Sequence, residues 1–121
     1  MKKKIIIGLL TSLILAIAHQ VVYSQAKNNS PQYQTFEELC FNKDNLTPET
    51  RHTVEVLLEV ARTKEYNTAQ SVLEQNPELL LEDRQITDVS PLANFTNLIK
   101  LELNKNQITD VSPLANLIKL E

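Results

Sequence analysis

Glycine is almost absent from this chain of 121 residues, and the single one, Gly8, lies in an apolar segment near the N-terminus. Phosphate-binding loops and the nucleophile elbows of hydrolases need glycine where the backbone turns sharply or approaches a ligand. The chain after residue 26 has no glycine to supply either motif. The sequence therefore argues against nucleotide-dependent enzymes and against hydrolases with a nucleophile elbow.

Cysteine and histidine are equally scarce. Cys40 is the only cysteine, which excludes a disulfide within one chain, and His52 is the only histidine after residue 26. Metal sites built from these residue types need several closely spaced ligands, so we predict no metal and no cofactor. The apolar surroundings of Cys40 favour a small buried side chain, and the alternative is a thiol that pairs with another chain. We expect His52 on the solvent side of a helix.

Basic residues are few and scattered. The chain has 12 basic and 15 acidic residues, a formal net charge of −3, which becomes −6 once the three N-terminal lysines are removed. An acidic chain without a basic cluster cannot hold a phosphate backbone, so we expect no nucleic-acid partner. Acidic pairs such as Glu37 and Glu38 have no predicted pocket around them, and acid–base catalysis needs one. We predict no enzyme and no small-molecule substrate.

The N-terminus has the pattern of a secretory signal. Lys2, Lys3 and Lys4 precede a mostly apolar run that ends at Ala18, and this order is typical of signal peptides. Small residues at positions 24 and 26 predict cleavage after Ala26. The alternative is an uncleaved membrane anchor, but a spanning helix needs about 20 apolar residues. We expect a signal peptide over residues 1–26 and export to the periplasm or the outside, with membrane contact only through an uncleaved segment.

The middle of the chain predicts helices. Residues 27–34 are polar and are expected to form a flexible lead-in, followed by a helical N-terminal cap over residues 35–76. A short helix is expected from Thr35 to Phe41, a longer one from Thr47-Pro48 to Arg62, and a third from Thr68 to Gln75. Their predicted inward side chains are Val54, Leu57, Leu58, Ala61, Ala69, Val72 and Leu73.

The remainder of the chain, residues 77–121, repeats itself. Residues 85–94 read QITDVSPLAN, and residues 107–116 read the same ten letters 22 positions later. The register extends backwards, because Leu79 matches Leu101 and Leu81 matches Leu103. A fixed period of this length is typical of a solenoid of stacked units. We divide the region into a first repeat, 79–100, and a second, incomplete repeat, 101–121.

The apolar spacing within one unit predicts a short strand. Leu101 and Leu103 are two residues apart and point to one side of it, as do Leu79 and Leu81 in the first unit. Asn106 follows where the chain turns, and its amide can satisfy backbone groups that the turn leaves unpaired. The fold class is therefore α/β, a short solenoid of about two repeats whose parallel strands follow a helical cap.

These residues resemble a known family. Leu98, Leu101, Leu103, Asn106 and Ile108 stand at the spacing L-x-x-L-x-L-x-x-N-x-I, which resembles the leucine-rich repeat consensus. The stretch ITDVSPLANFTNL resembles the 22-residue internalin-type subclass. The preceding segment, LTPETRHTVEVLLEVA, is similar to the region before such repeats in secreted cyanobacterial proteins. In those relatives a second cysteine would lie near Tyr66, so a disulfide across the cap is unavailable here.

The sequence departs from a regular array near its end. Leu117 follows Leu114 by three residues, whereas Leu98 follows Leu92 by six, so the pattern indicates three missing residues on the convex side. On this alignment Glu121 falls inside the next strand. Arg84 replaces the asparagine of the first unit, which predicts a junction with the helical cap.

The resemblance implies a non-catalytic module that binds a protein partner through its concave strand face. The residues on that face are Glu78, Leu80, Glu82, Lys100, Glu102 and Asn104. The alternative is that the chain is a truncated, non-functional remnant of a longer leucine-rich repeat protein.

Overall fold

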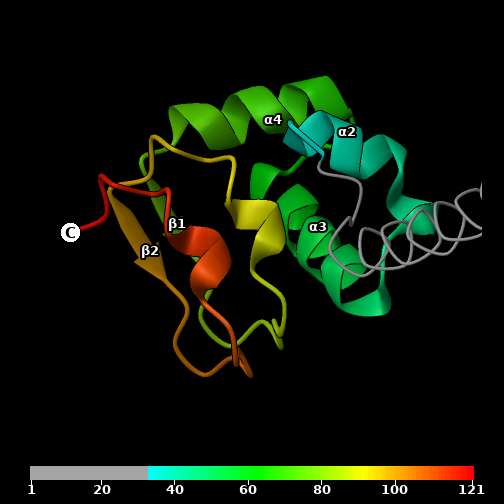
Figure 1. Cartoon of the computed structure of the whole chain (residues 1–121). Coiled ribbons are helices and arrows are strands. Elements are labelled where there is room, and N and C mark those ends of the chain that lie inside the picture. Colours follow the sequence, from blue (N-terminus) through cyan, green and yellow to red (C-terminus); the bar gives the residue numbers. More distant parts are fainter. Residues whose placement is uncertain (1–32) are drawn as a thin grey trace, which may run out of the picture. The chain divides into compact units, whose positions relative to one another are not determined.

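A computed structural model describes residues 33–121 (Figure 1). The predicted signal peptide and most of the lead-in lie outside these residues. Within them no helix combines the length and the apolar character that crossing a membrane requires. The elements in chain order are α2 (Phe36–Phe41), the 3-10 helix η1 (Lys43–Asn45), α3 (Pro48–Ala61), α4 (Tyr66–Gln75), β1 (Glu78–Leu80), the 3-10 helix η2 (Ser90–Leu92), β2 (Lys100–Glu102) and the 3-10 helix η3 (Ser112–Leu114).

The ends of α3 follow from local chemistry, and the predicted helix is confirmed. Thr47 caps the N-terminus, because its hydroxyl oxygen accepts a hydrogen bond from the backbone N–H of Thr50 at 3.2 Å. Pro48 occupies the first turn, where a missing N–H is harmless. Arg62 takes a left-handed conformation, with φ of 55°, and ends the helix.

Helix α4 differs from the prediction in its start and in its inward face. It begins at Tyr66, two residues before Thr68, because the carbonyl of Glu65 already accepts the N–H of Ala69. Ala69 and Leu73 are buried, but Val72 is 43% exposed. The helix packs against α2 and α3, and Val72 lies outside the side of the helix that Ala69 and Leu73 bury. The placement of Val72 in the core was wrong.

The two strands form a parallel sheet in the register that the repeat predicts. Glu78 lies opposite Lys100, Leu79 opposite Leu101 and Leu80 opposite Glu102. Each pair is separated by the same 22 residues that separate the two QITDVSPLAN stretches. The described part of the chain is therefore a small α/β fold, as predicted.

A single apolar core joins the helices to the repeats. The rings of Phe36 in α2 and Phe95 in the first repeat lie 5.6 Å apart. Helix α3 packs against η2, and η2 packs against η3, so these elements form successive layers. The most deeply buried side chains include Leu57, Leu73, Leu79, Leu81, Ile86 and Leu92. Burial of each such side chain contributes on the order of 2 kcal/mol.

A row of polar contacts ties α3 to the first repeat. Thr53 is fully buried, and its hydroxyl donates to the backbone carbonyl of Asp88 at 2.6 Å. The hydroxyl of Thr50 donates to the carboxylate of Asp88 at 2.6 Å. Nε2 of His52 lies 2.8 Å from the carbonyl oxygen of Arg84, so the ring nitrogen must donate. His52 is half-buried, and the expectation of a solvated surface residue was wrong because the first repeat packs beside this side of α3.

Replacing Thr53 with valine tests this junction. Thr53→Val keeps the shape but leaves the carbonyl of Asp88 without its donor, which should lower the free energy of unfolding by about 1–2 kcal/mol. Urea unfolding measures the change. Thr68→Val, at an exposed threonine of α4, is the control and should change it by less than about 0.5 kcal/mol. Equal stability of the two variants would contradict the role of Thr53.

Candidate functional site

The exposed side of the sheet carries the six residues predicted to bind a partner. We call Glu78, Leu80, Glu82, Lys100, Glu102 and Asn104 the strand face. Along the first strand these residues alternate with buried Leu79 and Leu81, so they share the opposite side. The strand register then places Glu78 beside Lys100 and Leu80 beside Glu102. The sheet therefore gathers residues from both repeats into one patch.

Ion pairs order the charges on this patch. Nζ of Lys100 lies 2.8 Å from a carboxylate oxygen of Glu102, and the hydrogen bond that Lys100 donates to Glu102 raises the pKa of Lys100. Nζ of Lys105 lies 2.8 Å from a carboxylate oxygen of Glu82. Sequence reasoning missed Lys105, which follows the second strand and has a left-handed backbone with φ of 59°. Leu80 stands among these charges with 55% of its surface exposed.

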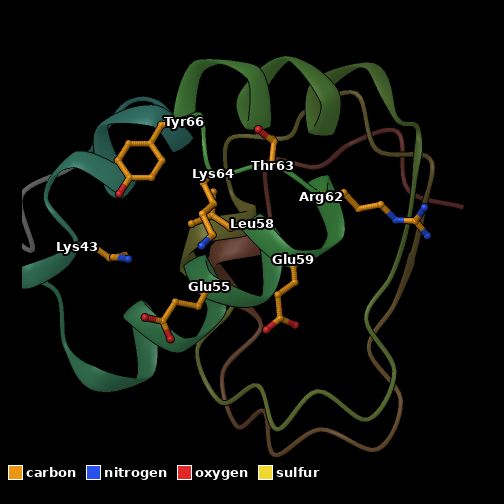
Figure 2. A pocket seen from close by; sticks show the side chains of 8 residues that line it. All are labelled: Lys43, Glu55, Leu58, Glu59, Arg62, Thr63, Lys64 and Tyr66. Carbon is orange, nitrogen blue, oxygen red and sulfur yellow. The ribbon is translucent and has the colours of Figure 1, made fainter.

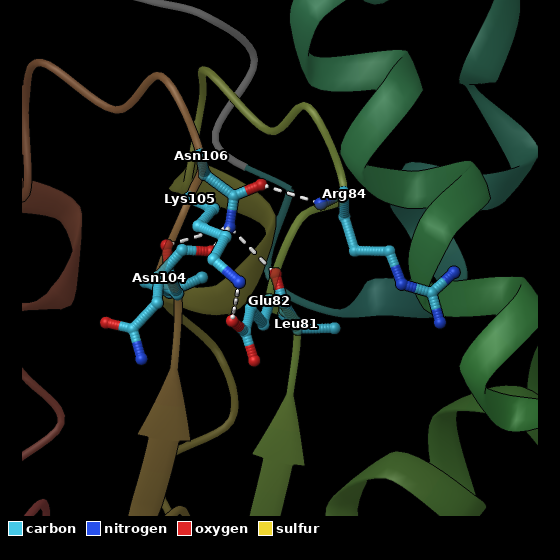
Figure 3. Close-up of polar contacts among 7 residues, drawn as sticks. Leu81, Glu82, Arg84, Asn104, Lys105 and Asn106 are labelled. Carbon is cyan, nitrogen blue, oxygen red and sulfur yellow. Dashed lines mark hydrogen bonds and ion pairs between the residues drawn. The ribbon is translucent and has the colours of Figure 1, made fainter.

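Asn106 holds the two repeats together beside the strand face (Figure 3). Its Oδ1 accepts the backbone N–H groups of Arg84 and Ile86, each at 3.0 Å. Its Nδ2 donates to the carbonyls of Leu81 at 2.7 Å and Leu103 at 2.8 Å. One amide therefore satisfies groups of its own turn and of the turn before it.

Arg84 occupies the equivalent position in the first repeat but cannot make these contacts. A guanidinium has donors only, and Asn106 relies on both a donor and an acceptor. The side chain of Arg84 turns instead toward α3, where Nη1 lies 3.4 Å from a carboxylate oxygen of Glu59. Both groups are substantially exposed, so this pair adds little stability. The contact places Arg84 at the junction with the helices.

The inward leucines of the two repeats differ in burial. Leu79 and Leu81 are at most 1% exposed, whereas Leu101 and Leu103 are half-buried. The first repeat has α3 on one side and the second repeat on the other. Within residues 33–121 the second repeat has a neighbour on one side only. Equivalent leucines thus share an orientation but not an environment.

The end of the second repeat keeps the 22-residue period. The N–H of Leu117 bonds to the carbonyl of Leu114, as Phe95 bonds to Leu92, and Leu120 bonds to Leu117, as Leu98 bonds to Phe95. Leu117 is 4% exposed, close to the 2% of Phe95. Leu117 therefore fills the place of Phe95, and the expectation of three missing residues was wrong. The match between Leu117 and Phe95 is hard to recognise in the sequence, because a leucine stands at the position of an aromatic residue.

Cys40 has the environment of a structural thiol. It is 1% exposed, and burial raises the pKa of its thiol to about 11. The thiolate is the form that attacks another sulfur, so burial opposes both the access and the ionisation that pairing with another chain would need. The core interpretation of Cys40 is therefore favoured.

The remaining polar groups among residues 33–121 include aspartates that shape the turns of the repeats. No cluster of three or more potential metal ligands occurs within them. The carboxylate of Asp110 accepts from the N–H of Ser112 at 2.9 Å, and hydrogen bonding to Ser112 lowers the pKa of Asp110. Asp88 bonds to Ser90 in the same way at 2.9 Å. Both aspartates thus shape the turn of their repeat.

The helical part also carries a surface hollow of about 670 Å³ (Figure 2). Sequence reasoning did not find it, because it forms between η1, α3 and the start of α4. The figure shows Arg62 directed away from Tyr66 and Lys43. Acidic and basic side chains share its lining, without a convergent set aimed at one point. The lining residues are Lys43, Glu55, Leu58, Glu59, Arg62, Thr63, Lys64 and Tyr66.

Comparison with known families identifies the repeated region. Residues 78–121 match the family described as leucine-rich repeats, in two copies. The predicted leucine-rich repeats are therefore confirmed over these residues. Comparisons with curated proteins and with solved structures gave no match.

Substitution of Asn106 tests its bridging role. Asn106→Ala leaves two N–H groups and two carbonyls without their partner, and we expect the free energy of unfolding to fall by about 2–3 kcal/mol. Asn106→Asp should also destabilise, because a carboxylate cannot donate to Leu81 and Leu103. Thermal or urea unfolding followed by circular dichroism measures both. Asn104→Ala, at an exposed side chain, is the control, and an equal loss there would refute the assignment.

Proposed function

We propose that the two leucine-rich repeats at residues 78–121 form a non-catalytic module that binds a protein partner through the strand face. Leucine-rich repeats commonly mediate protein–protein binding. The observation that carries the proposal is the arrangement of that face, in which exposed Leu80 is surrounded by ordered charges from both strands. Protein interfaces commonly combine an apolar centre with a polar rim.

The rigidity of the strand face supports this use. The hydrogen bonds from Leu81 and Asp83 to Glu102 and Asn104, at 2.8 and 2.9 Å, fix one strand against the other. The ion pairs of Lys100 and Lys105 lie on this face, at exposed positions where such pairs add little stability. A backbone that is already fixed loses less entropy when a partner binds.

The helical segment is part of the proposal as a cap. Leucines at the start of a repeat stack must be covered, and α3 covers η2 with its polar row and its apolar side chains. On this view the repeats are a short solenoid of the internalin-type subclass, closed on one side by α2, α3 and α4. Its resemblance to secreted cyanobacterial proteins supports the same arrangement.

Binding is tested at Leu80. The protein carrying a photocrosslinking residue at position 80 is mixed with exported proteins of its source organism, and the captured partner is then purified. We expect Leu80→Arg to weaken the measured affinity at least tenfold, because a central apolar contact is replaced by a charge. Val72→Arg, at an apolar residue of α4 with 43% exposure, should leave the affinity unchanged. Equal binding by the wild type and Leu80→Arg would exclude the strand face.

Export completes the proposal, with the mature chain in the periplasm or outside the cell. It is supported by the basic and then apolar N-terminus and by the small residues at positions 24 and 26. The intact mass of the protein made by its source organism tests it. We expect a chain that begins at Lys27, and recovery of the full chain from the cytoplasm would contradict export.

A further inference from the structure

The charges of the strand face are unequally matched. Each of its two lysines has a carboxylate oxygen 2.8 Å away, since Lys100 is paired with Glu102 and Lys105 with Glu82. The third carboxylate, that of Glu78, takes part in no ion pair among residues 33–121. The strand face therefore has one carboxylate left for a partner, while both of its cations are already engaged.

The choice made by Lys100 is what leaves Glu78 unpaired. The strand register puts Lys100 opposite Glu78, yet its Nζ bonds to Glu102 of its own strand. The hydrogen bond to Glu102 is the main cause of the raised pKa of Lys100, and the charge of Glu78 is the smallest contribution. One ammonium group thus lies near two carboxylates and is bonded to only one of them.

The unpaired carboxylate stands beside the exposed leucine of the strand face. Glu78 and Leu80 are two residues apart on β1, so both point to the same side of the sheet, with Cα atoms roughly 7 Å apart. Both side chains are exposed, Leu80 to 55%. On the other side of Leu80, Glu82 is occupied by Lys105. The face therefore offers an apolar contact with an unpaired negative charge next to it.

The charge of the described chain has the same sign as this surplus. All 15 acidic residues lie within residues 33–121, whereas four of the 12 basic residues lie before them, at Lys2, Lys3, Lys4 and Lys27. An excess of negative charge attracts cationic partners and repels anionic ones. An acidic partner would also have to draw a lysine of the strand face away from its own carboxylate. Both arguments select a cationic partner.

We infer that the partner of the strand face is a protein segment that presents an apolar side chain to Leu80 and a lysine or arginine to Glu78. The spacing of the two contacts fits residues two apart on an extended segment, or three to four apart on one face of a helix. This inference rests on the proposed function and adds to it the chemistry of the partner.

The contact at Glu78 acts mainly on the choice of partner. An exposed ion pair alone contributes little to affinity. Charges beside an apolar contact instead speed association, make it dependent on salt and reject partners with the wrong charge. We therefore expect added salt to weaken binding, because it screens exposed charges.

Peptide selection tests the chemistry of the partner. A phage library of random dodecapeptides is selected on the immobilised full chain, and enriched peptides are synthesised. Those whose binding is lost with Leu80→Arg bind the strand face and are retained. In the retained peptides, lysine or arginine two to four positions from an apolar residue should be enriched at least about threefold over the library.

Exchange of charges tests the contact itself. Glu78→Lys should weaken the binding of a retained peptide about tenfold, measured by fluorescence polarisation. Glu55→Lys makes the same change of charge at an exposed glutamate of α3 and should weaken it less than about twofold. Replacing the basic residue of the peptide with glutamate should restore affinity for Glu78→Lys and reduce affinity for the wild type. If circular dichroism shows Glu78→Lys unfolded, Glu78→Gln takes its place and should weaken binding about threefold.

The outcomes separate this inference from the proposed function. If no selected peptide loses binding with Leu80→Arg, the strand face does not bind and the proposed function itself fails. If the retained peptides are acidic or uncharged beside their apolar residue, the strand face stands and the inferred chemistry of the partner is overturned. Equal binding of a retained peptide to the Glu78 variant and to Glu55→Lys overturns it as well.

Discussion

The hydrogen bonds made by the amide of Asn106 are the constraint on which the repeats depend. Stacked strands of three residues bury little surface, so the turns beside them must also be held together. Asn106 accepts two N–H groups of the first repeat and donates to carbonyls of both repeats. Because a buried backbone group without a partner costs about 1–3 kcal/mol, this one side chain fixes the turn, the spacing and the alignment of the strand face.

The first repeat has Arg84 at the position that Asn106 occupies in the second repeat. It is joined to the helical part by other hydrogen bonds. Thr53 and Thr50 bond to the backbone and side chain of Asp88, and His52 bonds to the carbonyl of Arg84. These contacts satisfy turn groups that a previous repeat would otherwise meet. The polar row and the apolar contacts of α3 with η2 together make the helices and the first repeat one packed unit.

The shortage of glycine shapes the turns. Within residues 33–121 four residues other than glycine have positive φ, namely Arg62, Asp83, Gln85 and Lys105. Such conformations cost roughly 1 kcal/mol for a residue with a side chain. Asp83 and Lys105 stand 22 residues apart and turn the chain at the same point of each repeat. Lys105 also gains an ion pair with Glu82 from its position. Sequence reasoning placed the turn at Asn106 but, with no glycine to mark them, did not find the residues of left-handed conformation.

The sequence by itself determined the period, the strand register and the side of the sheet on which each strand residue lies. Two identical decapeptides and the alternation of leucines are local patterns, and parallel pairing carries them directly into the register. Only the tertiary structure decided how deeply equivalent residues are buried, that His52 bonds to the first repeat, and that Leu117 takes the place of Phe95. The physical reason is that burial depends on what packs on both sides of a repeat, and two copies of one sequence can have different neighbours.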